Sequence, residues 1–246
     1  GYNDGAGNPP NPDGIMTDYL WKEILTKNKL SRIIENYAQV VVEEDPDTKK
    51  KTVKQIFPRY HQLDVVEKLL ADVKENGIGK RYLIQHSAGS GKSNSISWLA
   101  HQLIELEQDG HPILDSVLVV TDRRILDKQI RDNIKQFMQV ANTVAWAEHS
   151  GDLRDAIKDG KRIIITTIEK FPYVVPDIGA KHKNNKFAVI IDEAHSGQSG
   201  RNSAQMNLAL SGLASDDEMD NEDKINAMME GRKLLTNASY FAFTAT

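Results

Sequence analysis

One stretch constrains the fold of this chain more than any other, because a strand pattern, a glycine-rich loop and a helical pattern follow one another directly. Residues 81–85 have the apolar centre of a strand, residues 86–91 are mostly small and polar, and residues 93–108 have the spacing of an amphipathic helix. The loop runs into Gly91, Lys92 and Ser93, where the helix begins. This succession predicts a phosphate-binding loop on the edge of a sheet.

Each part of this loop meets a requirement of a bound triphosphate. Gly89 and Gly91 allow the backbone to curl so that successive N–H groups face one point, and the helix N-terminus adds positive potential there. Lys92 would reach the terminal phosphates, and the Ser93 hydroxyl would ligate magnesium. The predicted ATP-binding residues of the loop are Ser87, Ala88, Gly89, Ser90, Gly91, Lys92 and Ser93.

The loop departs from the strict pattern at its first position, where His86 replaces glycine. The half from Gly89 to Ser93 is intact. By itself, the loop leaves two alternatives open, namely a plain connection between a strand and a helix, and the nucleotide site of a kinase.

A second strand pattern ends in adjacent acids. Residues 187–191 are continuously apolar, and Asp192 and Glu193 follow them directly. Carboxylates in such a place are costly unless something positive lies nearby, and the carboxyl edge of an open α/β sheet is where ligands bind. We therefore expect Asp192 to hold magnesium and Glu193 to orient and deprotonate the attacking water, with Lys92 as the third catalytic residue. The alternative is a pair of capping acids in a turn.

The rest of the chain from residue 58 onward alternates between helical and strand patterns. We expect helices at 60–76, 126–139 and 151–159, and strands at 116–121, 162–166, 187–192 and 240–243. Such alternation with continuous apolar strands is typical of a parallel sheet covered on both faces. The sequence therefore predicts an α/β fold of three layers with a mostly parallel sheet.

The first 57 residues have a different pattern and are expected to form an appendage to a domain at 58–246. Residues 1–14 resemble a linker, residues 16–37 suit one or two amphipathic helices with Thr17 or Asp18 as N-cap, and residues 39–43 and 51–57 suit a hairpin. The turn of that hairpin would be Asp45 to Asp47.

The amino-acid composition excludes several classes of protein and of site. The absence of cysteine excludes disulfides and thiolate metal sites and suits a reducing compartment. The apolar runs are far shorter than the roughly 20 residues that cross a bilayer, and the N-terminus has no secretory pattern. A cytoplasmic protein without a membrane partner is expected. A net charge of -4 lacks the basic excess of many nucleic-acid binders, but a few local contacts can hold a nucleic-acid strand without such an excess.

Taken together, residues 87–93 and 192–195 resemble motifs I and II of superfamily two helicases and translocases of the DEAH-box kind. Residues 57–62 resemble the upstream element of that superfamily, 119–124 resemble motif Ia, and 243–246 resemble motif III. The resemblance implies a RecA-like lobe that binds Mg-ATP, with Gln62 reading adenine. It further implies DNA contacts by Thr121, Arg123, Arg124, Thr166 and Thr167, and coupling between motifs II and III by His195, Thr244 and Thr246.

Within that superfamily, residues 59–64, 86–93, 121–129 and 166–171 look like the motor subunit of type I restriction endonucleases. This resemblance implies ATP-driven translocation along double-stranded DNA, with methyltransferase and specificity subunits as partners. It also implies a nuclease domain before this chain and a second motor lobe, carrying an arginine finger, after it. The alternatives are another superfamily two motor, such as a chromatin-type translocase or an RNA helicase, and a nucleotide-gated interaction module.

Overall fold

The computed structural model describes residues 13–44, 48–87, 89–121, 144–147, 149–167, 171, 182–192 and 237–245. The chain divides into two compact units, residues 1–69 and 70–246, and the boundary lies within helix α2 (Tyr60–Asn76). We describe each unit by itself. The domain boundary expected after residue 57 stays a prediction.

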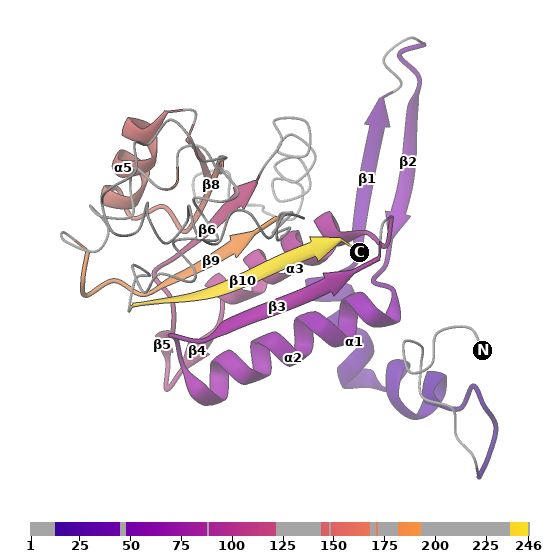
Figure 1. Cartoon of the computed structure of the whole chain (residues 1–246). Helices are drawn as coiled ribbons and strands as arrows, with labels where there is room; N and C mark the ends of the chain where they lie inside the picture. Colours follow the sequence, from indigo (N-terminus) through magenta and orange to yellow (C-terminus); the bar gives the residue numbers. More distant parts are fainter. Residues whose placement is uncertain are drawn as a thin grey trace, which may run out of the picture. The chain divides into compact units, whose positions relative to one another are not determined.

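The second unit is built on a six-stranded sheet (Figure 1). Its strands, in spatial order, are β3 (Arg81–His86), β10 (Ala238–Ala245), β9 (Phe187–Ile191), β6 (Ser116–Thr121), β8 (Ile163–Thr167) and β7 (Val144–Trp146). Every neighbouring pair in this sheet is parallel. The carboxyl ends of these strands therefore meet at one edge, where the predicted site residues follow β3 and β9.

The core lies on both faces of this sheet. Strands β6, β8 and β9 are buried along their whole length, as the apolar runs within them predict. On one face, Leu153, Ala156 and Ile157 of α5 (Ser150–Lys158) pack against side chains such as Leu118 and Val189. Helix α3 (Lys92–Ile104) contacts β6, β8 and β9 from the other face. The predicted three-layer, mostly parallel α/β fold is therefore confirmed.

Helix α3 ends four residues earlier than predicted. It ends at Ile104, and residues 107–108 instead form β4 (Glu107–Gln108), which pairs with β5 (His111–Pro112). Asp109 and Gly110 between them both have positive φ, 54° and 76°. An Asp-Gly pair favours such a two-residue hairpin turn, so this turn outcompetes the last turn of the helix. The helix predicted at 126–139 lies outside the described residues.

The first unit contains a π-helix, an α-helix and a hairpin. The π-helix η1 spans Leu20–Ile24 and α1 spans Lys27–Asn36, while β1 (Gln39–Glu44) pairs antiparallel with β2 (Lys51–Ile56). The predicted hairpin is confirmed; its turn at residues 45–47 lies outside the described part.

The predicted N-cap of the first helix is wrong. Tyr19 occupies that position in η1, and Asp18 instead accepts a hydrogen bond from Lys22. The flexible ammonium one turn later satisfies the carboxylate, so it does not cap the helix.

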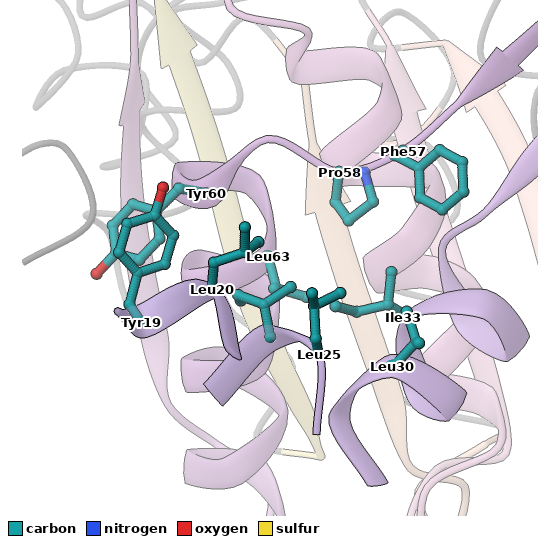
Figure 2. A pocket seen from close by; sticks show the side chains of 10 residues that line it. Tyr19, Leu20, Leu25, Leu30, Ile33, Phe57, Pro58, Tyr60 and Leu63 are labelled. Carbon is teal, nitrogen blue, oxygen red and sulfur yellow. The ribbon is translucent and has the colours of Figure 1, made fainter. Parts of the chain in front are cut away.

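An apolar pocket of about 330 Å³ lies within the first unit (Figure 2). It is lined by Tyr19, Leu20, Ile24, Leu25, Leu30, Ile33, Phe57, Pro58, Tyr60 and Leu63. The two tyrosine hydroxyls are the polar side-chain groups in this lining, and no charged side chain contributes to it. The pocket is therefore unsuited to a phosphate group.

Among the helices that the structure describes, none has the length and apolar character to cross a membrane.

Candidate nucleotide-binding site

The glycine-rich loop connects the end of β3 to the start of α3 in a tight turn. The Ser90 N–H donates to the Ser87 carbonyl at 3.1 Å, and Gly89 and Gly91 have φ of 71° and 85°. Residues with a Cβ seldom adopt these angles, so the backbone itself requires glycine here. A Cβ built on Gly89 would meet no atom within 4 Å. The loop therefore has open space beside Gly89, as a cradle for a ligand requires.

The start of α3 adds a second element that favours an anion. Its N-cap is Gly91, which has no side chain with which to cap the helix. The Asn94 and Ser95 N–H groups bond back to the Gly91 carbonyl, at 3.1 and 3.4 Å, and set the first turn. Because the first N–H groups of a helix have no acceptor within it, such an end attracts phosphate.

The loop and the acidic strand end meet directly. The Lys92 Nζ lies 3.1 Å from the Asp192 Oδ1, and the two side chains are 11% and 0% exposed. The Asp192 N–H donates to the Val120 carbonyl at 2.9 Å, which fixes this residue at the end of β9. A fully buried carboxylate is costly without a countercharge. The sequence predicted that something positive must lie near the acids, and the structure identifies it as Lys92.

This geometry fits a magnesium ion held together with phosphates. Among the described residues, no group of three or more His, Asp or Glu side chains could hold a metal ion. Magnesium, however, is usually bound through one or two carboxylates with phosphate oxygens and water. Asp192 at the strand end and Ser93 in the first turn of α3 supply that small donor set. Glu193, the predicted base, lies outside the described residues, as does Ala88 of the loop.

Gln62 has a local structural role. The residue is 3% exposed, and its Oε1 accepts a hydrogen bond from the Arg59 N–H at 2.8 Å. This is the bond by which a glutamine in the first turn satisfies the residue at the N-cap position. Gln62 therefore fixes the start of α2. Its predicted contact with adenine is not tested and stays a prediction.

The residues predicted to contact DNA fall at one edge of the sheet. Thr121 ends β6, and Thr166 and Thr167 end the neighbouring β8, with Thr121 opposite Thr167. All three are buried, and the Thr121 hydroxyl donates to the Thr166 carbonyl at 3.4 Å. Their contact with DNA stays a prediction. Arg123 and Arg124 lie outside the described residues.

The coupling residues can be placed only in part. Thr244 lies on β10 opposite Gln85, on the strand between those that lead to the loop and to Asp192. His195 and Thr246 lie outside the described residues. The position of Thr244 suits a link between the two halves of the site, but that role is not tested.

Sequence reasoning missed one contact of the loop. The His86 Nδ1 lies 2.9 Å from the Ser90 Oγ, and the two residues are 5% and 7% exposed. The His86 ring also packs against Phe243 of β10, with 5.7 Å between the ring centroids. The sequence feature that could have indicated this contact is His86 itself, which stands at the loop position where glycine is usual.

A polar network lies at the β3 edge of the sheet. The Tyr82 hydroxyl donates to the Asp72 Oδ2 at 2.7 Å, and the Lys80 Nζ lies 3.0 Å from both carboxylate oxygens. The hydrogen bond from Tyr82, followed by that from Lys80, lowers the pKa of Asp72. Burial, followed by the bond to Asp72, raises the pKa of Tyr82. This network ties α2 to β3 and contains no loop residue.

The family follows from comparison with known proteins. The family model described as SWI2/SNF2 ATPase matches residues 61–246. The chain belongs to the SWI2/SNF2 ATPase family. The matched region includes the loop and the acidic strand end, so membership of an ATPase family supports an ATP-binding lobe.

One solved structure similar to this SWI2/SNF2 ATPase is the UvsW helicase from bacteriophage T4, at 14% sequence identity and a TM-score of 0.47. The similarity covers 89% of this chain and 61% of the helicase chain, so this chain spans less than two thirds of that protein's length. A comparison with curated protein sequences gave no match.

Proposed function

We propose that this chain is the first motor lobe of a DNA translocase and that its loop and acidic strand end hold Mg-ATP for hydrolysis. The observation that carries the proposal is the 3.1 Å pair between Lys92 and Asp192. It joins the two sequence elements that a triphosphate and its metal require. Membership of the SWI2/SNF2 ATPase family supports the same chemistry.

The residues of the chain divide the work of phosphoryl transfer between them. The loop N–H groups and the N-terminus of α3 bind and orient the phosphates. Lys92 would turn from Asp192 to the terminal phosphates, and Asp192 and Ser93 would hold the metal. Magnesium, when bound, neutralises charge on the phosphate oxygens. Glu193 positions a water and accepts its proton, while Gln62 selects adenine.

We further propose that the translocase is the motor subunit of a type I restriction endonuclease, which moves along double-stranded DNA ahead of a nuclease domain. Four stretches of the sequence support this proposal because they resemble that subunit, namely residues 59–64, 86–93, 121–129 and 166–171. Methyltransferase and specificity subunits would then be its partners. DNA contacts would come from Thr121, Thr166 and Thr167 with Arg123 and Arg124. Within the part of the chain that the structure describes, the buried hydroxyls of Thr166 and Thr167 have no hydrogen-bond partner, which supports a rearrangement at this edge.

Steady-state phosphate release tests the motor function. In two-lobed motors an arginine finger on the second lobe completes the site, and such fingers raise rates by roughly 10³- to 10⁵-fold. The 246-residue chain should therefore hydrolyse ATP scarcely at all, with or without DNA. A longer chain that includes the second lobe should show DNA-stimulated release. Brisk DNA-stimulated hydrolysis by the 246 residues alone would contradict the two-lobe mechanism.

A matched variant separates binding from chemistry in the longer chain. Glu193→Gln keeps the size of the side chain and removes its basicity, so ATP binding should persist while turnover falls by about 10²- to 10⁴-fold. ATP binding without turnover under any condition, in the unmodified longer chain, would instead favour a nucleotide-gated interaction module.

The neighbouring reading frames test the proposal that this chain is the motor subunit of a type I restriction endonuclease. Genes for a methyltransferase and a specificity subunit beside this one would support the restriction role. Their absence would favour another superfamily two motor, such as a chromatin-type translocase.

A further inference from the structure

We propose that His86 is a positioning residue for the phosphate loop, because its ring holds Ser90 and is itself held by β10. The inference rests on the proposed ATP-binding function and deepens it. It assigns a role to the residue at which this loop departs from the usual glycine pattern.

The first step of the argument is the hydrogen bond that closes the loop. The His86 Nδ1 lies 2.9 Å from the Ser90 Oγ across a turn that the Ser90 N–H bond to the Ser87 carbonyl also closes. Ser90 stands between Gly89 and Gly91, both of which have left-handed backbone angles. Glycines place little restraint on their neighbours. A side-chain bond at Ser90 therefore restrains the loop at the point where its own backbone is freest.

The second step is the fixed orientation of the imidazole. His86 is the last residue of β3 and lies opposite Ala245 in the parallel pairing with β10. Its ring packs on Phe243, and both residues are buried. The ring is therefore held by the sheet, and its Nδ1 is directed at Ser90. A glycine at this position would lose both contacts.

The consequence is a loop that is ordered before nucleotide arrives. Binding then costs less conformational entropy than it would for a loop that must be ordered at the same time. Loss of one hydrogen bond of this kind should weaken Mg-ATP binding by about 3- to 10-fold. Loss of this hydrogen bond should lower the affinity for Mg-ATP without changing which nucleotide the loop prefers.

Three variants of the 246-residue chain separate the hydrogen bond from the ring. Ser90→Ala and His86→Phe each remove the bond, and His86→Phe keeps a ring beside Phe243. His86→Asn keeps a polar atom near the position of Nδ1 and removes the ring. His101→Asn, on α3 away from the loop, is the matched control.

Two measurements are made on each variant, namely Mg-ATP affinity by calorimetry and hydrogen exchange of the loop amides without nucleotide. Ser90→Ala and His86→Phe should weaken binding about equally and speed exchange across residues 87–92, and the double variant should be no weaker than either single one. His86→Asn should restore at least half of the lost binding free energy, and His101→Asn should match the unsubstituted chain. If His86→Phe does not fold, Ser90→Ala carries the same prediction.

Unchanged affinity and exchange in Ser90→Ala would overturn the proposal. It would be overturned equally by additive losses in the double variant, or by His86→Asn binding as weakly as His86→Phe. Failure of the unsubstituted chain to bind Mg-ATP would instead contradict the proposed function. The exchange measured without nucleotide would then still decide whether His86 restrains the loop.

Discussion

The buried pair of Lys92 and Asp192 should stabilise the folded chain even when no nucleotide is bound. The carboxylate is 0% exposed, whereas the lysine side chain is 11% exposed. Lys92→Ala leaves the carboxylate buried without its cation, and breaking a buried pair in this way costs about 3–5 kcal/mol. At about 2–4 °C per kcal/mol for a chain of this size, the melting temperature should fall by about 6–20 °C.

The opposite substitution should have a much smaller effect. Asp192→Asn removes the buried charge, and Lys92 can then extend toward water through its exposed fraction. We expect this variant to lie within about 1 kcal/mol of the unsubstituted chain, since neutral replacements of buried charges are often tolerated. The double variant should be close to Asp192→Asn alone, because the alanine no longer leaves a charge behind.

Urea denaturation in magnesium-free buffer measures these differences, since a divalent cation beside Asp192 could replace the lysine. The control is Lys68→Ala, which breaks a 2.8 Å pair with Asp64 on α2. Lys68 is 75% exposed, so its loss should cost no more than about 0.5 kcal/mol. If Lys92→Ala were no more destabilising than Lys68→Ala, or if the double variant were the sum of its parts, the countercharge argument would be wrong.

Other consequences of the structure can be measured in the same way. Gly89→Ala should cost about 1 kcal/mol through its positive φ alone, with Gly89→Asn milder, whereas Gly151→Ala in α5 should be neutral or stabilising in urea titrations. Asp72→Asn should lower the melting temperature at neutral pH. Because the folded-state pKa of Asp72 is depressed below 3.8 by Tyr82 and Lys80, this difference from the unsubstituted chain should persist above that pH and vanish as the pH falls through the folded-state value. Equal thermal melts of the two proteins at pH 7 would contradict it.

Much of the fold could be predicted because the sheet is buried on both faces. Strands such as Ser116–Thr121 have no exposed face, so the apolar run from Val117 to Val120 marks this strand directly. Helix α2 was predicted with the bounds that it has, because its apolar spacing is regular. The end of α3 was missed because the helical pattern continues past Ile104, while the competing signal is the short Asp109-Gly110 turn.

The site could be predicted in its parts but not in its contacts. The loop and the acidic strand end each have a local pattern, so Lys92 and Asp192 could be chosen as candidates from spacing alone. That they pair with each other depends on the order β3-β10-β9, which brings distant segments together. The bond from His86 to Ser90 depends on a rotamer and on packing against Phe243. The spacing of apolar and polar residues along the sequence does not predict such a contact.

Titration of the 246-residue chain with Mg-ATP, followed by its melting temperature, tests the central claim most directly. If Lys92, Ser93 and Asp192 hold the triphosphate and its metal, nucleotide at a hundred times its dissociation constant should stabilise the chain by about 2.7 kcal/mol. The shift should shrink when magnesium is chelated and disappear in Lys92→Ala, compared with the melting temperature of that variant without nucleotide. A shift of equal size in Lys92→Ala would contradict the assignment of the loop.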